Sequence, residues 1–204
     1  DRRVLIPRPE TELVAEHAIA AARSFSPRVV VDLGTGSGAI GLSMAAELPV
    51  DGTEVWLTDV STDALDVARA NVAAVGRGAA NVRIAQGSWY DALPTELRGN
   101  VNVIVANPPY IAHDDPEVEE SVREWEPESA LFADDDGLRD IATIVIGARE
   151  WLVPGGWLFV EIGHRQGDAV LDIAHHAGFD SESIEIVSDL AHRPRFLSAQ
   201  WRSG

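Results

Sequence analysis

The chain has 204 residues, 46% of them hydrophobic, which suits one domain with a sizeable core and excludes a disordered chain. It has no cysteine, which excludes disulfides, thiolate metal ligands and cysteine nucleophiles, and it has no apolar run of the ~18 residues that a membrane span needs. Its net charge of −17 disfavours direct binding to nucleic acid, which usually requires a basic patch.

Short apolar, β-branched runs alternate with segments of helical periodicity along the chain. The pattern predicts strands at residues 28–33, 54–58, 81–86, 102–106, 156–162, 183–187 and 195–201. It predicts helices at residues 11–22, 39–48, 61–75, about 137–152 and 168–177, with an irregular acidic stretch at 111–136. Such alternation is typical of a mostly parallel sheet with helices on both faces, closed here by an antiparallel strand pair. We therefore expect an α/β domain over residues 25–204, bordered by an N-terminal segment and helix over residues 1–24.

A glycine-rich loop follows the first strand and reads Gly34-Thr35-Gly36-Ser37-Gly38. Glycines at alternate positions let the backbone turn tightly and approach a ligand closely. A dinucleotide site would have the spacing G-x-G-x-x-G and would bind a pyrophosphate. The spacing G-x-G-x-G suits a ligand without phosphate, such as S-adenosylmethionine. An ordinary tight strand-to-helix turn is the alternative, and the loop alone does not decide between them.

An acidic residue, Asp59, ends the second strand, 21 positions after Gly38. At that place a carboxylate can accept hydrogen bonds from both hydroxyls of a ribose. The alternative is that Asp59 caps the next helix, but Ser61 and Thr62 are available for that role. We therefore favour the ribose.

The third strand is followed by Ser88-Trp89. The loop at this position usually faces the adenine of the cofactor, so the Trp89 ring could cover the base. The alternative is a tryptophan buried in the core, because the chain has six tryptophans and most of them must be structural.

The fourth strand is followed by Asn107-Pro108-Pro109-Tyr110, which is the strongest signal in the chain. An amide nitrogen is a poor nucleophile, and two acceptors, the Asn107 side-chain oxygen and the Pro108 carbonyl, can hold it through its hydrogens. The prolines rigidify the loop, and Tyr110 offers a face for stacking. The alternative is a proline-rich turn. Together the loops predict a Rossmann-like class I S-adenosylmethionine-dependent methyltransferase fold, a mostly parallel seven-stranded sheet with an antiparallel last strand.

The segment of residues 4–12 (VLIPRPETE), with Asn107–Tyr110, resembles the HemK/PrmC family of release factor glutamine methyltransferases. The resemblance extends over essentially the whole chain. It implies transfer of a methyl group from S-adenosylmethionine to the glutamine side-chain nitrogen in the Gly-Gly-Gln loop of peptide chain release factors, with Asn107–Tyr110 binding the substrate. It also places Arg8, Glu10 and Thr11 beside the substrate entrance, although the start of a helix would equally explain them.

Two departures from the family stand out. Ser88 replaces the common aspartate before the tryptophan, and the family's N-terminal helical substrate-binding domain is absent from this chain. The alternatives are a nucleic-acid N-methyltransferase, acting on adenine N6 or guanine N2 with the same loop, and a non-catalytic cofactor-binding module. No metal is expected, because the adjacent His175 and His176 do not share a helix face. We expect a cytoplasmic protein, since no apolar leader follows Asp1 and cysteine is absent. We also expect a monomer.

Overall fold

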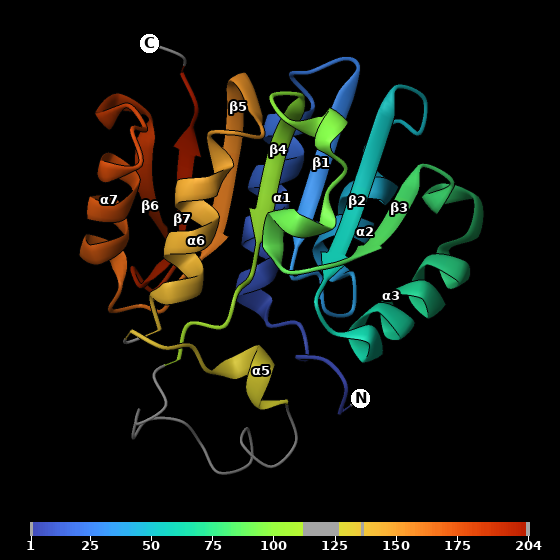
Figure 1. The fold of residues 1–204 in the computed structure, drawn as a ribbon, viewed down its shortest axis with the longest axis horizontal. Helices are drawn as coiled ribbons and strands as arrows, with labels where there is room; N and C mark the ends of the chain where they lie inside the picture. Colours follow the sequence, from blue (N-terminus) through green and yellow to red (C-terminus); the bar gives the residue numbers. More distant parts are fainter. Residues whose placement is uncertain (1, 112–126, 136, 203–204) are drawn as a thin grey trace.

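The computed structural model describes residues 2–111, 127–135 and 137–202. Seven strands form one sheet in the order β3-β2-β1-β4-β5-β7-β6 (Figure 1). Every neighbouring pair from β3 to β5 is parallel, and β7 is antiparallel to both β5 and β6. The predicted topology is therefore confirmed. The strands are β1 Arg28–Leu33, β2 Thr53–Asp59, β3 Val82–Gln86, β4 Val101–Ala106, β5 Leu152–Glu161, β6 Ile184–Ser188 and β7 Pro194–Gln200.

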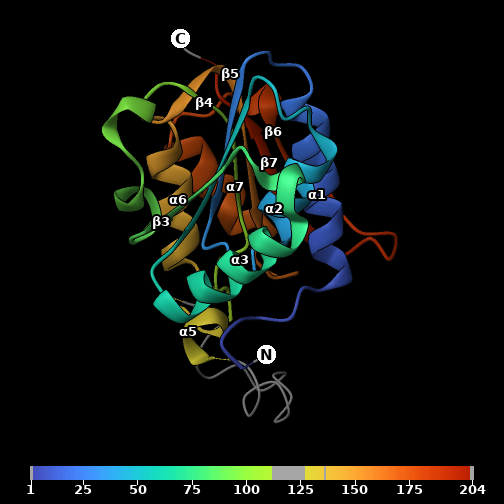
Figure 2. The same cartoon turned by 90° about the vertical axis from the view of Figure 1, so that its right-hand side faces the viewer.

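Helices cover both faces of the sheet (Figure 2). The helices α1 and α2 pack on one face, where Val14 and Met44 meet β-strand residues such as Val103. The helices α6 and α7 pack on the other face, where Ile144 and Val170 are fully buried. The helices are α1 Pro9–Ala22, α2 Ala39–Glu47, α3 Thr62–Val75, α5 Glu128–Leu131, α6 Arg139–Ala148 and α7 Gly167–His176, with 3₁₀ turns at Gly76–Ala79, Trp89–Ala92, Thr95–Leu97 and Ser181–Ser183.

The burial of each strand follows its place in the sheet. Every residue of β4, in the middle, is buried, which explains why this strand, covered on both faces, is apolar except for Asn102. The outer strands β3 and β6 have no fully buried residue. No helix in the described part of the chain is long and apolar enough to cross a membrane.

Two adjacent predicted boundaries are wrong, the end of one helix and the start of the strand that follows it. The helix expected at 137–152 begins at Arg139 and ends at Ala148, and β5 begins at Leu152 rather than at residue 156. Leu152 pairs with Val101 of β4, and Pro154 disfavours a helical conformation at the residue before it. The other boundaries agree within two residues. Most of the acidic stretch expected at 111–136, residues 112–126, lies outside the described residues. The expectation of irregular structure is wrong at Glu128–Leu131, which form the short helix α5.

The first prediction concerns Gly41, where α2 crosses the sheet. A Cβ on Gly41 would lie 2.1 Å from Leu57 Cδ2, and Leu57 is fully buried. Gly41→Ala should therefore lower the free energy of unfolding by about 1–2 kcal/mol, because overpacking outweighs the helix propensity gained. Urea unfolding measures this, with Ser43→Ala on the exposed face of the same helix as the control. A stabilised Gly41→Ala would refute the close packing.

Candidate active site

A cavity of about 450 Å³ lies at the edge of the sheet where β1, β2, β3 and β4 end. In Figure 1 this is the lower edge, near α5 and the N-terminal segment. The structure thus brings together the four loops that the sequence singled out, as expected at the carboxyl edge of a parallel sheet. The predicted site residues that line the cavity are Gly34, Thr35, Gly36, Ser37, Asp59, Ser88, Trp89, Asn107 and Pro109, together with Thr11.

Five predicted residues are not among the described residues that line the cavity: Arg8, Glu10, Gly38, Pro108 and Tyr110. Gly38 is the N-cap of α2 and has a left-handed backbone (φ 83°), and Arg8 is the N-cap of α1. Arg8 and Glu10 therefore lie at the start of α1, which is the alternative that the sequence left open, although the Arg8 side chain makes no capping hydrogen bond. Their contact with a substrate remains a prediction.

A buried carboxylate, that of Asp32, shapes the glycine loop. Its Oδ2 accepts hydrogen bonds from the Thr35 hydroxyl at 2.6 Å and from the Gly41 backbone N–H at 2.9 Å. Burial raises the pKa of Asp32 to about 7, although both hydrogen bonds lower it. No role for Asp32 was expected from the sequence, although an aspartate two residues before Gly34 was a signal.

Asp59 joins the glycine loop to the start of α3. Its Oδ2 accepts from the Gly36 N–H and its Oδ1 from the Ser61 N–H, both at 2.9 Å. Ser61 itself caps α3 by accepting from the Ala64 N–H, as predicted. An ionised carboxylate has about four acceptor sites, so Asp59 can still accept hydrogen bonds from a ligand in the cavity.

Trp89 forms a wall of the cavity above the glycine loop. A Cβ on Gly34, whose φ is 66°, would lie 3.0 Å from the indole ring, so this close approach requires glycine. The indole N–H donates to Asp140 Oδ1 at 3.3 Å, and Asp140 also lines the cavity. No pattern in the sequence marked Asp140. Trp89 has a φ of 46°, which residues other than glycine rarely adopt.

The Asn107 side chain presents an unused acceptor. Its Nδ2 donates to the Thr11 hydroxyl oxygen at 3.4 Å, and its Oδ1 is buried without a hydrogen-bond partner in the described residues. A buried acceptor left without a partner costs about 1–3 kcal/mol. Asn81 Oδ1 shares this property but does not line the cavity, so it is the position of Asn107 at the cavity that points to a ligand. The Asn107 oxygen can accept a hydrogen bond from that ligand.

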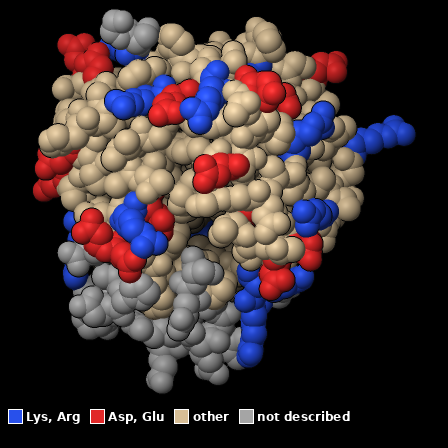
Figure 3. All heavy atoms as spheres, viewed as in Figure 1, with Lys and Arg blue, Asp and Glu red and all other residues tan. Residues whose placement is uncertain are grey.

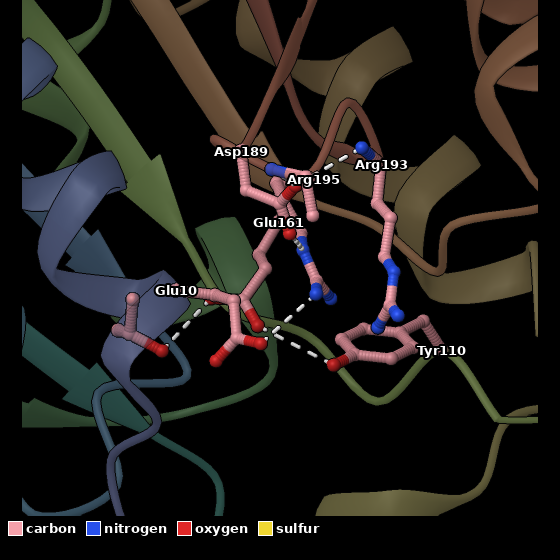
Figure 4. Close-up of polar contacts among 8 residues, drawn as sticks. Glu10, Tyr110, Glu161, Asp189, Arg193 and Arg195 are labelled. Carbon is pink, nitrogen blue, oxygen red and sulfur yellow. Dashed lines mark hydrogen bonds and ion pairs between the residues drawn. The ribbon is translucent and has the colours of Figure 1, made fainter.

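A buried glutamate, Glu161 at the end of β5, lies beside this loop. It accepts from the Thr11 hydroxyl at 2.9 Å and from the Tyr110 hydroxyl at 3.4 Å (Figure 4). Nearby, Arg195 forms ion pairs with Glu10 at 2.9 Å and with Asp189 at 2.8 Å. Burial raises the pKa of Glu161 to about 7. Tyr110 is thus turned to Glu161, and its stacking role stays a prediction.

The strand order and the glycine loop together define a Rossmann-like class I methyltransferase fold. A family model described as "Methyltransferase small domain" matches residues 10–124, so the chain belongs to that family. This fold and family imply S-adenosylmethionine as the cofactor. A solved protein-(glutamine-N5) methyltransferase (release factor-specific) from Alicyclobacillus acidocaldarius is 27% identical, with a TM-score of 0.56 over 97% of this chain and 95% of that one.

Two curated relatives confirm the resemblance to release factor glutamine methyltransferases. The protein of that name from Burkholderia pseudomallei is 44% identical over 191 residues, which are 92% of this chain and 65% of the relative. Its namesake from Xylella fastidiosa (strain 9a5c) is 43% identical, over 94% of this chain and 66% of the relative. The chain thus spans slightly less than two thirds of the length of these relatives.

The second prediction concerns the cost of ionising Glu161. The pKa of a glutamate is ordinarily 4.5, and burial raises the pKa of Glu161 to about 7 in the folded protein. Between these two pH values the folded protein keeps a proton on Glu161 that the unfolded chain has lost. The stability of the parent protein should therefore fall as the pH rises through this window. Glu161→Gln removes the penalty. Relative to the parent, its free energy of unfolding should rise by on the order of 2–3 kcal/mol between about pH 5 and about pH 8.

Urea unfolding of both proteins across this pH range measures the difference. Glu96→Gln is the control, because Glu96 is exposed. A pH-independent difference between parent and Glu161→Gln would contradict the raised pKa.

Proposed function

We propose that the chain catalyses S-adenosylmethionine-dependent methylation of the glutamine side-chain nitrogen in the Gly-Gly-Gln loop of peptide chain release factors. The observation that carries the proposal is the buried, partnerless Asn107 Oδ1 beside the cavity. It is supported by the relatives named release factor glutamine methyltransferase.

The cofactor would lie over the ends of β1, β2 and β3. The cavity is open above Gly36, where an added Cβ would meet nothing within 4 Å, so a ligand can approach the loop backbone. Asp59 would accept hydrogen bonds from the ribose hydroxyls, and Trp89 would flank the adenine. Bound there, S-adenosylmethionine supplies a methyl group on a positively charged sulfur.

The substrate amide would be held by the loop after β4. A primary amide nitrogen carries two N–H donors, and Asn107 Oδ1 and the Pro108 carbonyl would accept one each. The two bonds fix the nitrogen and stabilise the positive charge that develops on it. Its proton can leave to water after alkylation. Pro109 lines the cavity and would contact the substrate, while Tyr110 would support the loop or stack on the amide.

The charge distribution favours a protein substrate over a nucleic acid. The face in Figure 3 carries acidic and basic side chains interspersed over its described part, without a continuous basic stripe. A net charge of −17 repels a phosphate backbone. The same loop could bind a nucleobase amine, so a nucleic acid serves as the comparison substrate below.

The third prediction concerns Asp59. Asp59→Ala should weaken S-adenosylmethionine binding by about 1–3 kcal/mol, because it removes a charged acceptor for the ribose. Calorimetry measures the affinity. Asp66→Ala, which removes a charge from the exposed side of α3, is the matched control. Thermal unfolding checks that the glycine loop survives the loss of the bond to Gly36. Unchanged affinity would refute the ribose assignment.

The fourth prediction concerns Asn107. Asn107→Ala should lower the rate of methyl transfer by about 10²–10³, because its oxygen interacts most strongly with the charged transition state. Cofactor affinity and fold should remain close to those of the parent. The measurement is single-turnover methylation of a release factor with labelled S-adenosylmethionine, with Asn100→Ala, in an exposed turn, as the control.

Two comparison substrates complete this test: a release factor whose Gly-Gly-Gln glutamine is replaced by glutamate, and a DNA duplex. Label should enter only the natural release factor. Methylation of the duplex alone would overturn the substrate, whereas near-parental activity of Asn107→Ala would overturn the mechanism.

A further inference from the structure

A chain of hydrogen bonds connects Asn107 to a carboxylate outside the cavity. Asn107 Nδ2 donates to Thr11 Oγ1 at 3.4 Å, and Thr11 Oγ1 donates to Glu161 Oε2 at 2.9 Å. Thr11 is 5% exposed and Glu161 is 3% exposed, so water competes little for these bonds. The three residues come from α1, from β5 and from the loop after β4, so only the folded chain brings them together.

The direction of these bonds is fixed by the carboxylate. An ionised Glu161 has no proton and can only accept. The single proton of the Thr11 hydroxyl is therefore committed to Glu161, and the Thr11 oxygen can only accept from Asn107. The amide of Asn107 must then turn its NH₂ group to Thr11 and its oxygen away from it. This explains why Oδ1, rather than Nδ2, is the atom without a partner.

We propose that Thr11 and Glu161 are positioning residues that hold the Asn107 side chain with its oxygen directed at the substrate nitrogen. The proposal rests on the proposed function for the identity of the substrate only. The orientation of the amide is a property of the protein alone.

Protonation of Glu161 would reverse the donor–acceptor direction of the hydrogen bonds that connect Glu161, Thr11 and Asn107. A protonated carboxyl can donate to Thr11, and the Thr11 hydroxyl can then donate to an Asn107 oxygen turned inward. Other groups face Glu161 from three elements: Glu10 of α1, Tyr110 of the loop after β4 and Arg195 of β7 (Figure 4). Glu10 raises and Arg195 lowers the pKa of Glu161, which burial brings to about 7. The correct orientation should therefore be lost as the pH falls below about 7.

Kinetics give the first test. Thr11→Val keeps the shape but removes the hydroxyl, and kcat should fall on the order of 10²-fold with little change in KM, since the acceptor is misplaced. Thr11→Ser restores the hydroxyl and should restore kcat. In the parent, kcat should decline below about pH 7, and Glu161→Gln should lose this limb of the profile. Cofactor affinity, measured by calorimetry, should be the same in all these proteins.

Nuclear magnetic resonance of the protein without substrate gives the second test. The ¹⁵N–¹H signals of the Asn107 side chain, assigned by their loss in Asn107→Ala, should shift with a midpoint near pH 7 in the parent. The shift should be absent in Glu161→Gln. Asn102 is the internal control, because it is equally part of the β4 region but binds the Val29 N–H through its Oδ1.

The two tests separate the inference from the proposed function. Asn107 signals that do not titrate, or that titrate alike in Glu161→Gln, would overturn the positioning role, and so would parental kcat in Thr11→Val. Another outcome is that the parent methylates no release factor while its Asn107 side-chain signals titrate with Glu161. In that case the proposed substrate is wrong and the positioning role is supported.

Discussion

The shared register of four parallel strands is the constraint on which the site depends. Leu33 of β1 lies opposite Thr58 of β2 and Ala106 of β4, and Asp59 lies opposite Gln86 of β3. The four strands therefore end at one level, and the loops that follow them all begin at the cavity. Because β1, β2 and β4 are anchored by buried apolar residues, a slip of one residue in any of them would turn its core side chains to the opposite face. The strand register that packs the core therefore also aligns the loops that form the site.

Two carboxylates are buried beside this edge at a cost to stability. Asp32 and Glu161 are almost fully buried, and each has a pKa raised to about 7. Within the described residues neither forms an ion pair that would offset desolvation, and both are used as acceptors for neighbouring groups instead. Asp32 fixes the path of the glycine loop, and Glu161 fixes the hydroxyls of Thr11 and Tyr110. Burial of these two carboxylates lowers stability, but their hydrogen bonds orient groups that face the cavity.

The sequence predicted the parts of the site that lie at the end of a strand or just after one. Asp59 ends β2, and the glycine loop, Trp89 and Asn107 come soon after β1, β3 and β4, so the strand pattern alone places them at one edge of the sheet. Thr11 and Glu161 are separated by 150 positions, and no spacing rule connects a residue of α1 with the end of β5. Contacts between distant parts of the chain also explain the wrong end predicted for α6. There the pairing of Leu152 with Val101 of β4 outweighed the local helical pattern.

The residues proposed to bind the cofactor and those proposed to bind the substrate lie at different parts of the sheet. The proposed cofactor contacts follow β1, β2 and β3. Asp59 is held there by the backbone N–H groups of Gly36 and Ser61, while the side chains of Asp32 and Asp140 hold Thr35 and Trp89. Around Asn107, side chains from α1 and from β5 to β7 supply the contacts. A chain of side-chain hydrogen bonds fails when one member is lost. In the part of the chain that the structure describes, Thr11 and Glu161 form none of the hydrogen bonds that hold the cofactor loops, so substitutions there can change the positioning of the substrate without disturbing those loops.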